Sequence, residues 1–224
     1  MAGMDSAPPP SVPAPSAPAP IAQTPIAGLL LAAGAGSRHG SPKALRRGDD
    51  GRPWLLRAID ALREGGCSPV IVVLGARGDE AESLLPGRGE TPARGGGLVV
   101  VHAVDWAEGV SASLRAGLAA AAALEPAPAA VAVVPVDVPD LDGRVVARLI
   151  GAGDDDDATS VGPDTLRQAG FDGRPGHPVV IGRRHWAPLG ERLAGDTGAR
   201  PYLVEHGVRM IDCADLGTGA DVDD

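Results

Sequence analysis

After Pro25 the chain alternates between short apolar runs and segments with helical periodicity, and this alternation limits the possible folds more than any other feature. Buried strands are predicted where apolar runs lie between Gly, Pro and polar residues, at 26–33, 68–76, 97–103 and 129–139. Helices are predicted for the amphipathic or Ala-rich segments, at 52–66, 111–124 and 142–152. Strands that alternate with helices form crossover units, so the sequence predicts a single-domain α/β fold with a doubly wound, mostly parallel sheet.

Composition narrows the class of protein. Hydrophobic residues make up 44% but aromatic residues only 2%, which suits an aliphatic core between helices and a parallel sheet. No apolar run approaches the length of a membrane span, and the net charge of −9 argues against nucleic acid as a partner. Cysteines are too few for a disulfide framework, so we expect a reduced, cytoplasmic protein. We interpret residues 1–25 as a disordered Pro/Ala-rich tail without a secretory signal, and residues 26–224 as the folded domain.

A glycine-rich segment follows the first predicted strand, within GLLLAAGAGSRHGSPKAL at 28–45. Its glycines leave backbone N–H groups accessible, and Arg38 and Lys43 add two cations without any carboxylate. Because ligands of open α/β sheets bind at the carboxyl ends of strands, this loop is a candidate polyphosphate site. Two common phosphate motifs do not match. The dinucleotide fingerprint needs glycine where His39 stands, and a P-loop needs Ser or Thr where Ala44 follows the lysine.

The segment LAAGAGSRHGSPK resembles the signature L-A-[AG]-G-x-[GS]-x-R-M-G-x-x-K of the molybdopterin-cofactor family of NTP transferases, with His39 in place of the usual Met. The resemblance covers roughly residues 26–224 and implies a Rossmann-like nucleotidyltransferase fold. It implies that Arg38 grips phosphate oxygens in a fork and that Lys43 supplies a point charge, both in catalytic roles. The nucleotide-binding residues that it implies in this loop are Leu31, Ala32, Ala33, Gly34, Gly36, Ser37, Arg38 and Lys43.

Carboxylates at two places are candidate metal ligands. Asp137 directly follows the apolar run AVAVV, and the matching Asp of the family, in a D-x-P segment, binds Mg²⁺. The neighbouring Asp140 is expected to cap the helix at 142–152 instead. The chain ends in ADVDD where the family has D-[IV]-D-T-P-E-D-L, and this match implies Asp223, rather than Asp221, as a second metal ligand. An acidic tail without such a role is the alternative.

Two further segments carry the resemblance towards the substrates. HAVDWAEGVSASLRAGL at 102–118 resembles a family segment beside the nucleotide base, which implies that Gly109 and Ser113 bind the nucleotide. The alternative is that Ser111 or Ser113 simply caps the following helix.

GRPGHPVVIGRRHW at 173–186 and LAGDTGARPYL at 193–203 resemble the acceptor side of the family, which implies acceptor-binding roles for His177, Asp196 and Arg200. A solvent-facing loop position for His177 and a helix-capping role for Asp196 are the alternatives.

Together these matches imply an enzyme, a Mg²⁺-dependent nucleotidyltransferase that transfers CMP from CTP to the phosphate of molybdopterin and releases pyrophosphate. The acceptor segments occur in the cytidylyltransferase branch, and the loop has LAAG rather than the LAGG associated with guanine selection. Two alternatives stay open. One is a transferase for another phosphorylated acceptor, such as a sugar phosphate or a phosphorylated alcohol, and the other is a non-catalytic carrier of molybdopterin. The protein partner implied is a molybdoenzyme or its maturation factor.

Overall fold

The computed structural model describes residues 25–36, 40–86, 97–151 and 160–221. The predicted tail lies outside these residues, apart from Pro25, and so do the site candidates Ser37, Arg38 and Asp223. The strands are β1 (Ile26–Ala32), β2 (Val70–Leu74), β3 (Leu98–His102), β4 (Ala130–Pro135), β5 (Leu166–Phe171), β6 (Arg174–Gly182) and β7 (Arg209–Asp212). The helices are α1 (Trp54–Glu64), α2 (Gly78–Glu82), α3 (Val110–Ala122), α4 (Gly143–Ile150), α5 (Trp186–Arg192) and α6 (Arg200–Glu205). Short 3₁₀ turns occupy Lys43–Leu45, Trp106–Glu108 and Arg183–His185.

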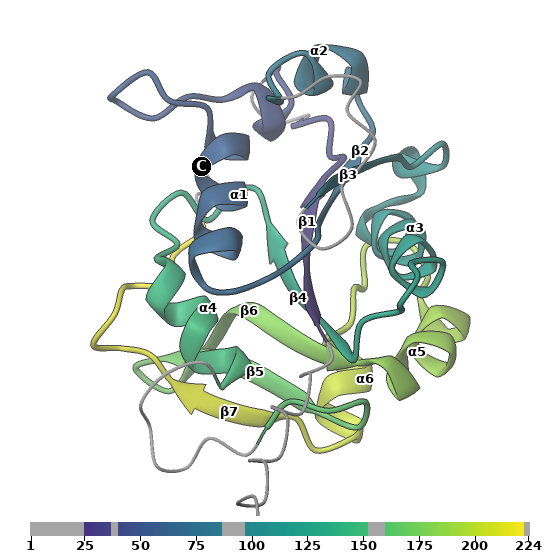
Figure 1. The fold of residues 1–224 in the computed structure, drawn as a ribbon. Coiled ribbons are helices and arrows are strands. Elements are labelled where there is room, and N and C mark those ends of the chain that lie inside the picture. The colour runs from purple at the N-terminus through teal and green to yellow at the C-terminus, as the bar shows by residue number, and fades with distance from the viewer. Residues whose placement is uncertain (1–24, 37–39, 87–96, 152–159, 222–224) are drawn as a thin grey trace, which may run out of the picture.

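The strands form one mixed sheet in the order β3-β2-β1-β4-β6-β5-β7 (Figure 1). Strands β1 to β4 are parallel, as predicted, and β1 pairs with both β2 and β4. The second half of the sheet departs from the parallel pattern, because β6 runs antiparallel to both β4 and β5. The prediction of an α/β fold with helices around one sheet is confirmed, and the four predicted strands and three predicted helices all form.

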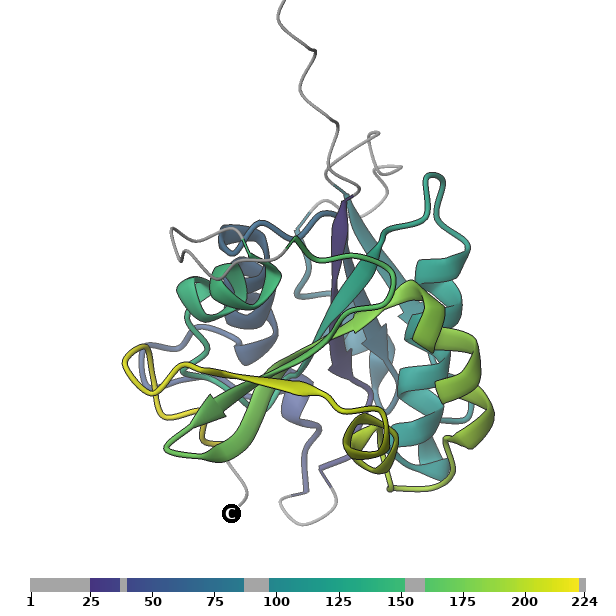
Figure 2. The same cartoon turned by 90° about the horizontal axis from the view of Figure 1, so that it is seen from below.

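Helices cover both faces of the sheet, and the side-chain alternation of the central strand explains why. Leu30 and Ala32 of β1 point into a cluster with α1 and α4, whereas Ala27 and Leu29 point into a second cluster with α3 and α5. Figure 2 shows the two helix layers on either side of the strands. Both clusters are largely aliphatic, as the low aromatic content predicts. None of the helices in the described residues is long and apolar enough to cross a membrane.

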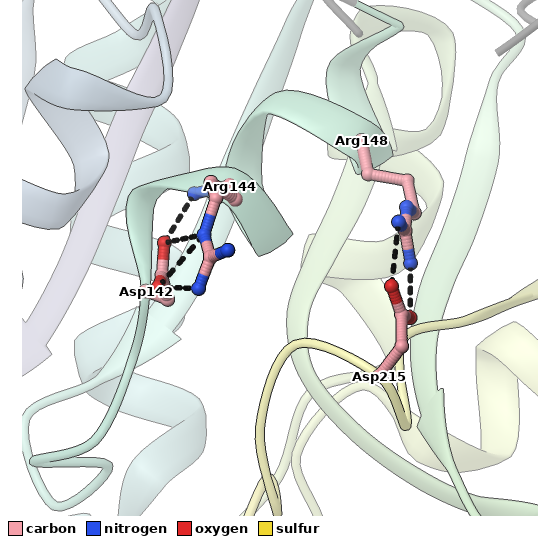
Figure 3. A network of polar contacts seen from close by, with 4 residues as sticks. All are labelled: Asp142, Arg144, Arg148 and Asp215. Atoms are coloured by element: carbon pink, nitrogen blue, oxygen red, sulfur yellow. Dashed lines mark hydrogen bonds and ion pairs between the residues drawn. The ribbon is translucent and has the colours of Figure 1, made fainter.

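The start of α4 corrects one sequence prediction. The residue that caps this helix is Asp142, whose Oδ1 accepts a hydrogen bond of 2.7 Å from the backbone N–H of Arg144 (Figure 3). Asp140, which was expected to be the cap, instead accepts a hydrogen bond of 2.7 Å from the hydroxyl of Thr218. The turn before the helix therefore extends two residues further than the sequence suggested. Hydrogen bonding with Arg144 lowers the pKa of the Asp142 carboxyl below its ordinary value.

We expect Asp142→Ala to lower the free energy of unfolding by about 1 kcal/mol at neutral pH, because an N-terminal amide of α4 loses its acceptor. The pKa of Asp142 is lowered by folding, so its contribution is present above the unfolded pKa of about 4 and is lost as pH falls through the folded value. Urea unfolding at several pH values measures this difference, with Asp140→Ala as the matched control. A difference between wild type and variant that does not shrink in acid contradicts the assignment.

The same helix holds the segment that follows β7. Arg148 of α4 forms two hydrogen bonds with the carboxylate of Asp215, at 2.6 and 3.0 Å (Figure 3), and a third with the carbonyl oxygen of Asp212. Two parallel hydrogen bonds between a guanidinium and a carboxylate fix the relative orientation of the two side chains as well as their distance. The chain beyond β7 is thereby attached to α4 before it reaches Asp221, the last described residue.

Candidate active site

A cavity of about 390 Å³ lies at the carboxyl ends of β1 and β4. Its walls come from the glycine-rich loop after β1, the segment after β4, the turn into α3 and Asp196. The lining residues named by the sequence analysis are Leu31, Ala33, Gly34, Gly36, Lys43, Gly109, Ser113, Asp137 and Asp196. We call this space the first cavity. Ala32, the remaining described residue of the predicted loop set, is buried in the core below it instead.

The glycine-rich loop is folded tightly against its own continuation. Gly36 has a φ of 60°, and a side chain there would overlap with the carbonyl oxygen of Ser41. The base of the loop is fixed on both sides, because Leu31 accepts a hydrogen bond from the N–H of Val136 after β4, and Ala33 accepts one from the N–H of Ala76 after β2. The loop after β1 is thus held between its two neighbouring strands.

Lys43 and Asp137 face one another in this cavity although 94 positions separate them in the sequence. The Lys43 Nζ lies 2.7 Å from Asp137 Oδ2, and the two side chains are only 21% and 19% exposed. The predicted meeting of the loop cation with the carboxylate after β4 therefore occurs in the structure. An ion pair of this kind is only partly screened by solvent.

The second carboxylate oxygen of Asp137 is available for another ligand. Asp137 Oδ1 is buried, and no group in the described part of the chain makes a hydrogen bond with it. Leaving a buried charged oxygen without a partner is costly, so such atoms are commonly ligand contacts. A carboxylate oxygen beside a candidate phosphate loop has the chemistry that Mg²⁺ or Mn²⁺ requires, so Asp137 fits a divalent cation.

The turn into α3 corrects a second expectation from the sequence. Gly109 is the N-cap of α3, and neither Ser111 nor Ser113 caps it, because both lie within the helix and are buried. Ser113 lines the first cavity beside the half-buried Trp106. Because Ser113 lines a cavity and does not cap the helix, the contact between its hydroxyl and a nucleotide remains a prediction.

A second cavity of about 330 Å³ adjoins the first. His177, Asp196 and Arg200, the three predicted acceptor residues, all line it, and so does Asp221. The polar side chains of Gln168 and Thr197 also line it, together with the aliphatic side chains of Leu31, Val110, Leu114, Val133, Val179, Ile181 and Leu203. Residues from 31 to 221 thus meet in one space that no local sequence pattern defines.

His177 and Asp196 differ from the alternatives given for them. His177 lies in β6 and is half-buried, so it is not a solvent-facing loop residue. Its Nδ1 is buried and has no hydrogen-bond partner in the described residues. Burial lowers the pKa of the His177 imidazole, against the opposing effects of the Val133 backbone and of Asp137 and Asp221, which favours the neutral ring. Asp196 does not cap α6, whose N-cap is Ala199.

A separate group of side chains that could hold a metal ion was not predicted from the sequence. Ligand atoms of Asp79, Glu82 and His102 all lie within 4.8 Å of one another, at α2 and the end of the edge strand β3. His102 Nε2 lies 2.9 Å from a carboxylate oxygen of Glu82. None of the three lines either cavity, so this group is distinct from the site around Asp137.

Comparison with known proteins places this geometry in a family. A family model described as a MobA-like NTP transferase domain matches residues 28–210. Nicotine blue oxidoreductase from Paenarthrobacter nicotinovorans is 35% identical over 206 residues, which cover 88% of this chain and 91% of the relative.

Solved structures with the same fold include Rv0371c from Mycobacterium tuberculosis H37Rv, with a TM-score of 0.67, 27% identity and coverage of 91% of this chain and 94% of the other. A complex of Rv0371c with manganese matches with a TM-score of 0.63, 25% identity and coverage of 90% and 94%. The fold, the glycine-rich loop and the matched length agree, and the chain therefore belongs to the family of MobA-like NTP transferase domains, as a nucleotidyltransferase.

Proposed function

We propose that the protein transfers CMP from CTP to the phosphate group of a molybdopterin-type acceptor, with release of pyrophosphate. The observation that carries this proposal is the Lys43–Asp137 pair in the first cavity, beside Gly34 and Gly36 of the glycine-rich loop. A triphosphate needs cations and N–H donors on its outer phosphates, and the acceptor phosphate is already an anion at neutral pH. No residue is therefore required to remove a proton from the nucleophile.

The roles of the site residues follow from charge. Lys43 would bind phosphate oxygens and stabilise charge that develops on the departing pyrophosphate, and we propose the same role for Arg38. Asp137 would hold Mg²⁺, with Asp223 as the proposed second ligand. A cation held there would supply positive charge that neutralises phosphate oxygens and makes the phosphorus more electrophilic. The manganese complex of Rv0371c supports the use of a divalent cation.

The mixed lining of the second cavity supports an acceptor that has both apolar faces and hydrogen-bonding edges. Seven aliphatic side chains line it, while Gln168, His177, Asp196, Thr197, Arg200 and Asp221 supply polar groups. A pterin ring matches such walls, because its faces are apolar and its edges carry hydrogen-bonding groups. A sugar phosphate or phosphorylated alcohol has no flat apolar face to pack against the seven aliphatic side chains. The wall therefore favours the pterin acceptor over these alternatives.

The test is incubation of the purified full chain with Mg²⁺, molybdopterin and either CTP or GTP, followed by identification of the dinucleotide product. We expect pyrophosphate release and the cytosine dinucleotide with CTP, and at least about tenfold slower reaction with GTP. Acceptor controls are a sugar phosphate and a phosphorylated alcohol. Pyrophosphate release with these acceptors but not with molybdopterin would move the assignment to another acceptor. A non-catalytic carrier would bind molybdopterin and release no pyrophosphate with any acceptor.

A second candidate comes from the 35% identical relative, whose name describes an oxidoreductase for nicotine blue. The same two cavities would then hold the pyrophosphate of a nicotinamide dinucleotide and a flat heteroaromatic electron acceptor. The lack of glycine at His39 speaks against the usual dinucleotide loop. Following NADH and NADPH consumption in the presence of a conjugated dye distinguishes this reaction from transferase activity.

A further inference from the structure

The two cavities share a wall, and Asp196 forms part of it. Only three residues line both spaces among the residues that the structure describes: Leu31 at the end of β1, Val110 at the start of α3, and Asp196. Asp196 belongs to the connection between α5 and α6, which we call the 193–199 segment. A change in the position of this segment alters the shape of both cavities at once.

The 193–199 segment is attached to the first turn of α3. Asp196 Oδ1 accepts a hydrogen bond of 3.3 Å from the N–H of Val110, and the carbonyl oxygen of Gly195 accepts one of 3.1 Å from the N–H of Ser111. Arg115, one turn further along, donates a hydrogen bond of 2.8 Å to the carbonyl oxygen of Leu193. Three bonds thus join two segments that are about eighty residues apart in the sequence.

These bonds replace a cap that α3 lacks. The first N–H groups of a helix have no partner within the helix, and the N-cap Gly109 has no side chain to accept from them. Asp196 performs this function from a distant part of the chain, and its negative charge is favourable near the helix N-terminus. The attachment also explains why residue 109 is glycine. A side chain there would overlap with Asp196 and with the Gly195 carbonyl oxygen.

The charge of Asp196 argues against a direct grip on either phosphate. Both the triphosphate and the acceptor phosphate are anions, so a carboxylate in the shared wall repels them unless its charge is directed elsewhere. In the structure, the Asp196 carboxylate instead accepts a hydrogen bond from the N–H of Val110 at the start of α3.

We propose that Asp196 is a positioning residue that holds the nucleotide cavity and the acceptor cavity in register, so that the binding of one substrate favours the binding of the other. This inference rests on the proposed function, in which the two cavities take the two substrates. Binding of the first substrate would order Val110 and the 193–199 segment. The second substrate would then bind to a wall that is already ordered. Such coupling is reciprocal, so each substrate raises the affinity for the other by the same factor.

The first test uses amide hydrogen exchange on the ligand-free protein. Asp196→Ala should accelerate exchange at the N–H groups of Val110 and Ser111, whereas Asp196→Asn should leave them protected because the amide oxygen accepts the same bond. Glu191→Ala, which removes an exposed carboxylate of α5 outside both cavities, is the matched control. Unchanged exchange in Asp196→Ala overturns the proposal.

The second test measures steady-state kinetics and calorimetric binding of CTP with Mg²⁺. Asp196→Ala should raise the KM of both substrates by about tenfold. It should also reduce by about tenfold the factor by which each substrate raises the affinity for the other. For Asp196→Asn, all these values should stay within about threefold of wild type. Two results would contradict the proposal: a change in the acceptor KM alone for Asp196→Ala, or equal impairment of Asp196→Asn and Asp196→Ala. Either result would mean that Asp196 contacts the acceptor directly and does not couple the two cavities.

Gly109→Ala provides a second route if Asp196→Ala does not fold, because its side chain displaces Asp196 from the other side. It should reproduce the loss of coupling, and its effect should not add to that of Asp196→Ala. Additive effects contradict the shared link. Wild-type protein that binds no CTP contradicts the proposed transferase reaction, whereas the exchange experiment still decides the role of Asp196.

Discussion

Asp137→Asn is expected to lower kcat/KM for nucleotide transfer by about 10²–10³-fold while the fold remains intact. The substitution keeps the shape of the side chain but removes the negative charge from the buried oxygen that has no partner in the described residues. A neutral amide is a poor ligand for a divalent cation, so the loss should fall mainly on kcat and on metal affinity.

The measurement for Asp137→Asn is pyrophosphate release as a function of Mg²⁺ and Mn²⁺ concentration. Asp140→Asn is the matched control, because Asp140 lies three residues further along, contacts Thr218 and lines neither of the two large cavities. Partial recovery of the Asp137→Asn variant at high metal concentration supports the ligand role. Wild-type turnover in this variant at ordinary metal concentration would show that Asp137 holds no catalytic cation.

Lys43→Ala is expected to lower kcat/KM by about 10²-fold, since it removes the cation proposed to face the phosphates, in a site that solvent only partly screens. Its effect should appear in both nucleotide affinity and turnover. Lys43→Arg keeps the charge but changes its geometry, so we expect it to recover only part of the activity. The loss of folding stability should be small, about 1 kcal/mol, because the pair remains in contact with solvent.

Calorimetric titration with CTP and Mg²⁺, together with pyrophosphate release, measures the Lys43 effect. Arg47→Ala provides the control, because it removes an exposed cation that lies close to Lys43 in the sequence and lines neither cavity. Equal losses in both variants would mean that net charge, rather than the position of Lys43, attracts the nucleotide.

The parallel half of the sheet and the centre of the site were predictable because both depend on local patterns. Apolar runs bounded by glycine or proline mark β1, β2, β3 and β4, whose order along the chain alternates with helices. The loop with Lys43 and the segment with Asp137 follow the neighbouring strands β1 and β4, so the sequence alone was sufficient to expect them at one edge.

The antiparallel half was not predictable in the same way. β5 has the sequence LRQAGF, in which polar residues and a glycine interrupt the apolar pattern, and β6 contains prolines on both sides of His177. β6 pairs with β4 through residues 179–182 and with β5 on its other side, and this pairing overrides the weak strand propensity of both segments. His177 consequently lies in a half-buried strand rather than in an open loop.

Contacts at the starts of helices could also not be predicted from the sequence. Asp140 and Asp142 have equal capping propensity, and only the path of the turn selects Asp142. The serines at the start of α3 looked like caps, but the acceptors come from Gly195 and Asp196, far away in the chain. Long-range partners of this kind leave no periodic signal.

If the first cavity binds a nucleotide as proposed, the contact between Lys43 and Asp137 also affects which form of nucleotide it would select. With ammonium and carboxylate 2.7 Å apart, their local charges cancel, so a bare triphosphate meets as much repulsion from one as attraction from the other. A triphosphate already complexed with a divalent cation would offer phosphate oxygens to Lys43 and the cation to Asp137, and so would satisfy both side chains. Under the proposed function, this internal counter-ion would favour a metal-bound nucleotide over metal-free nucleotides and inorganic phosphate.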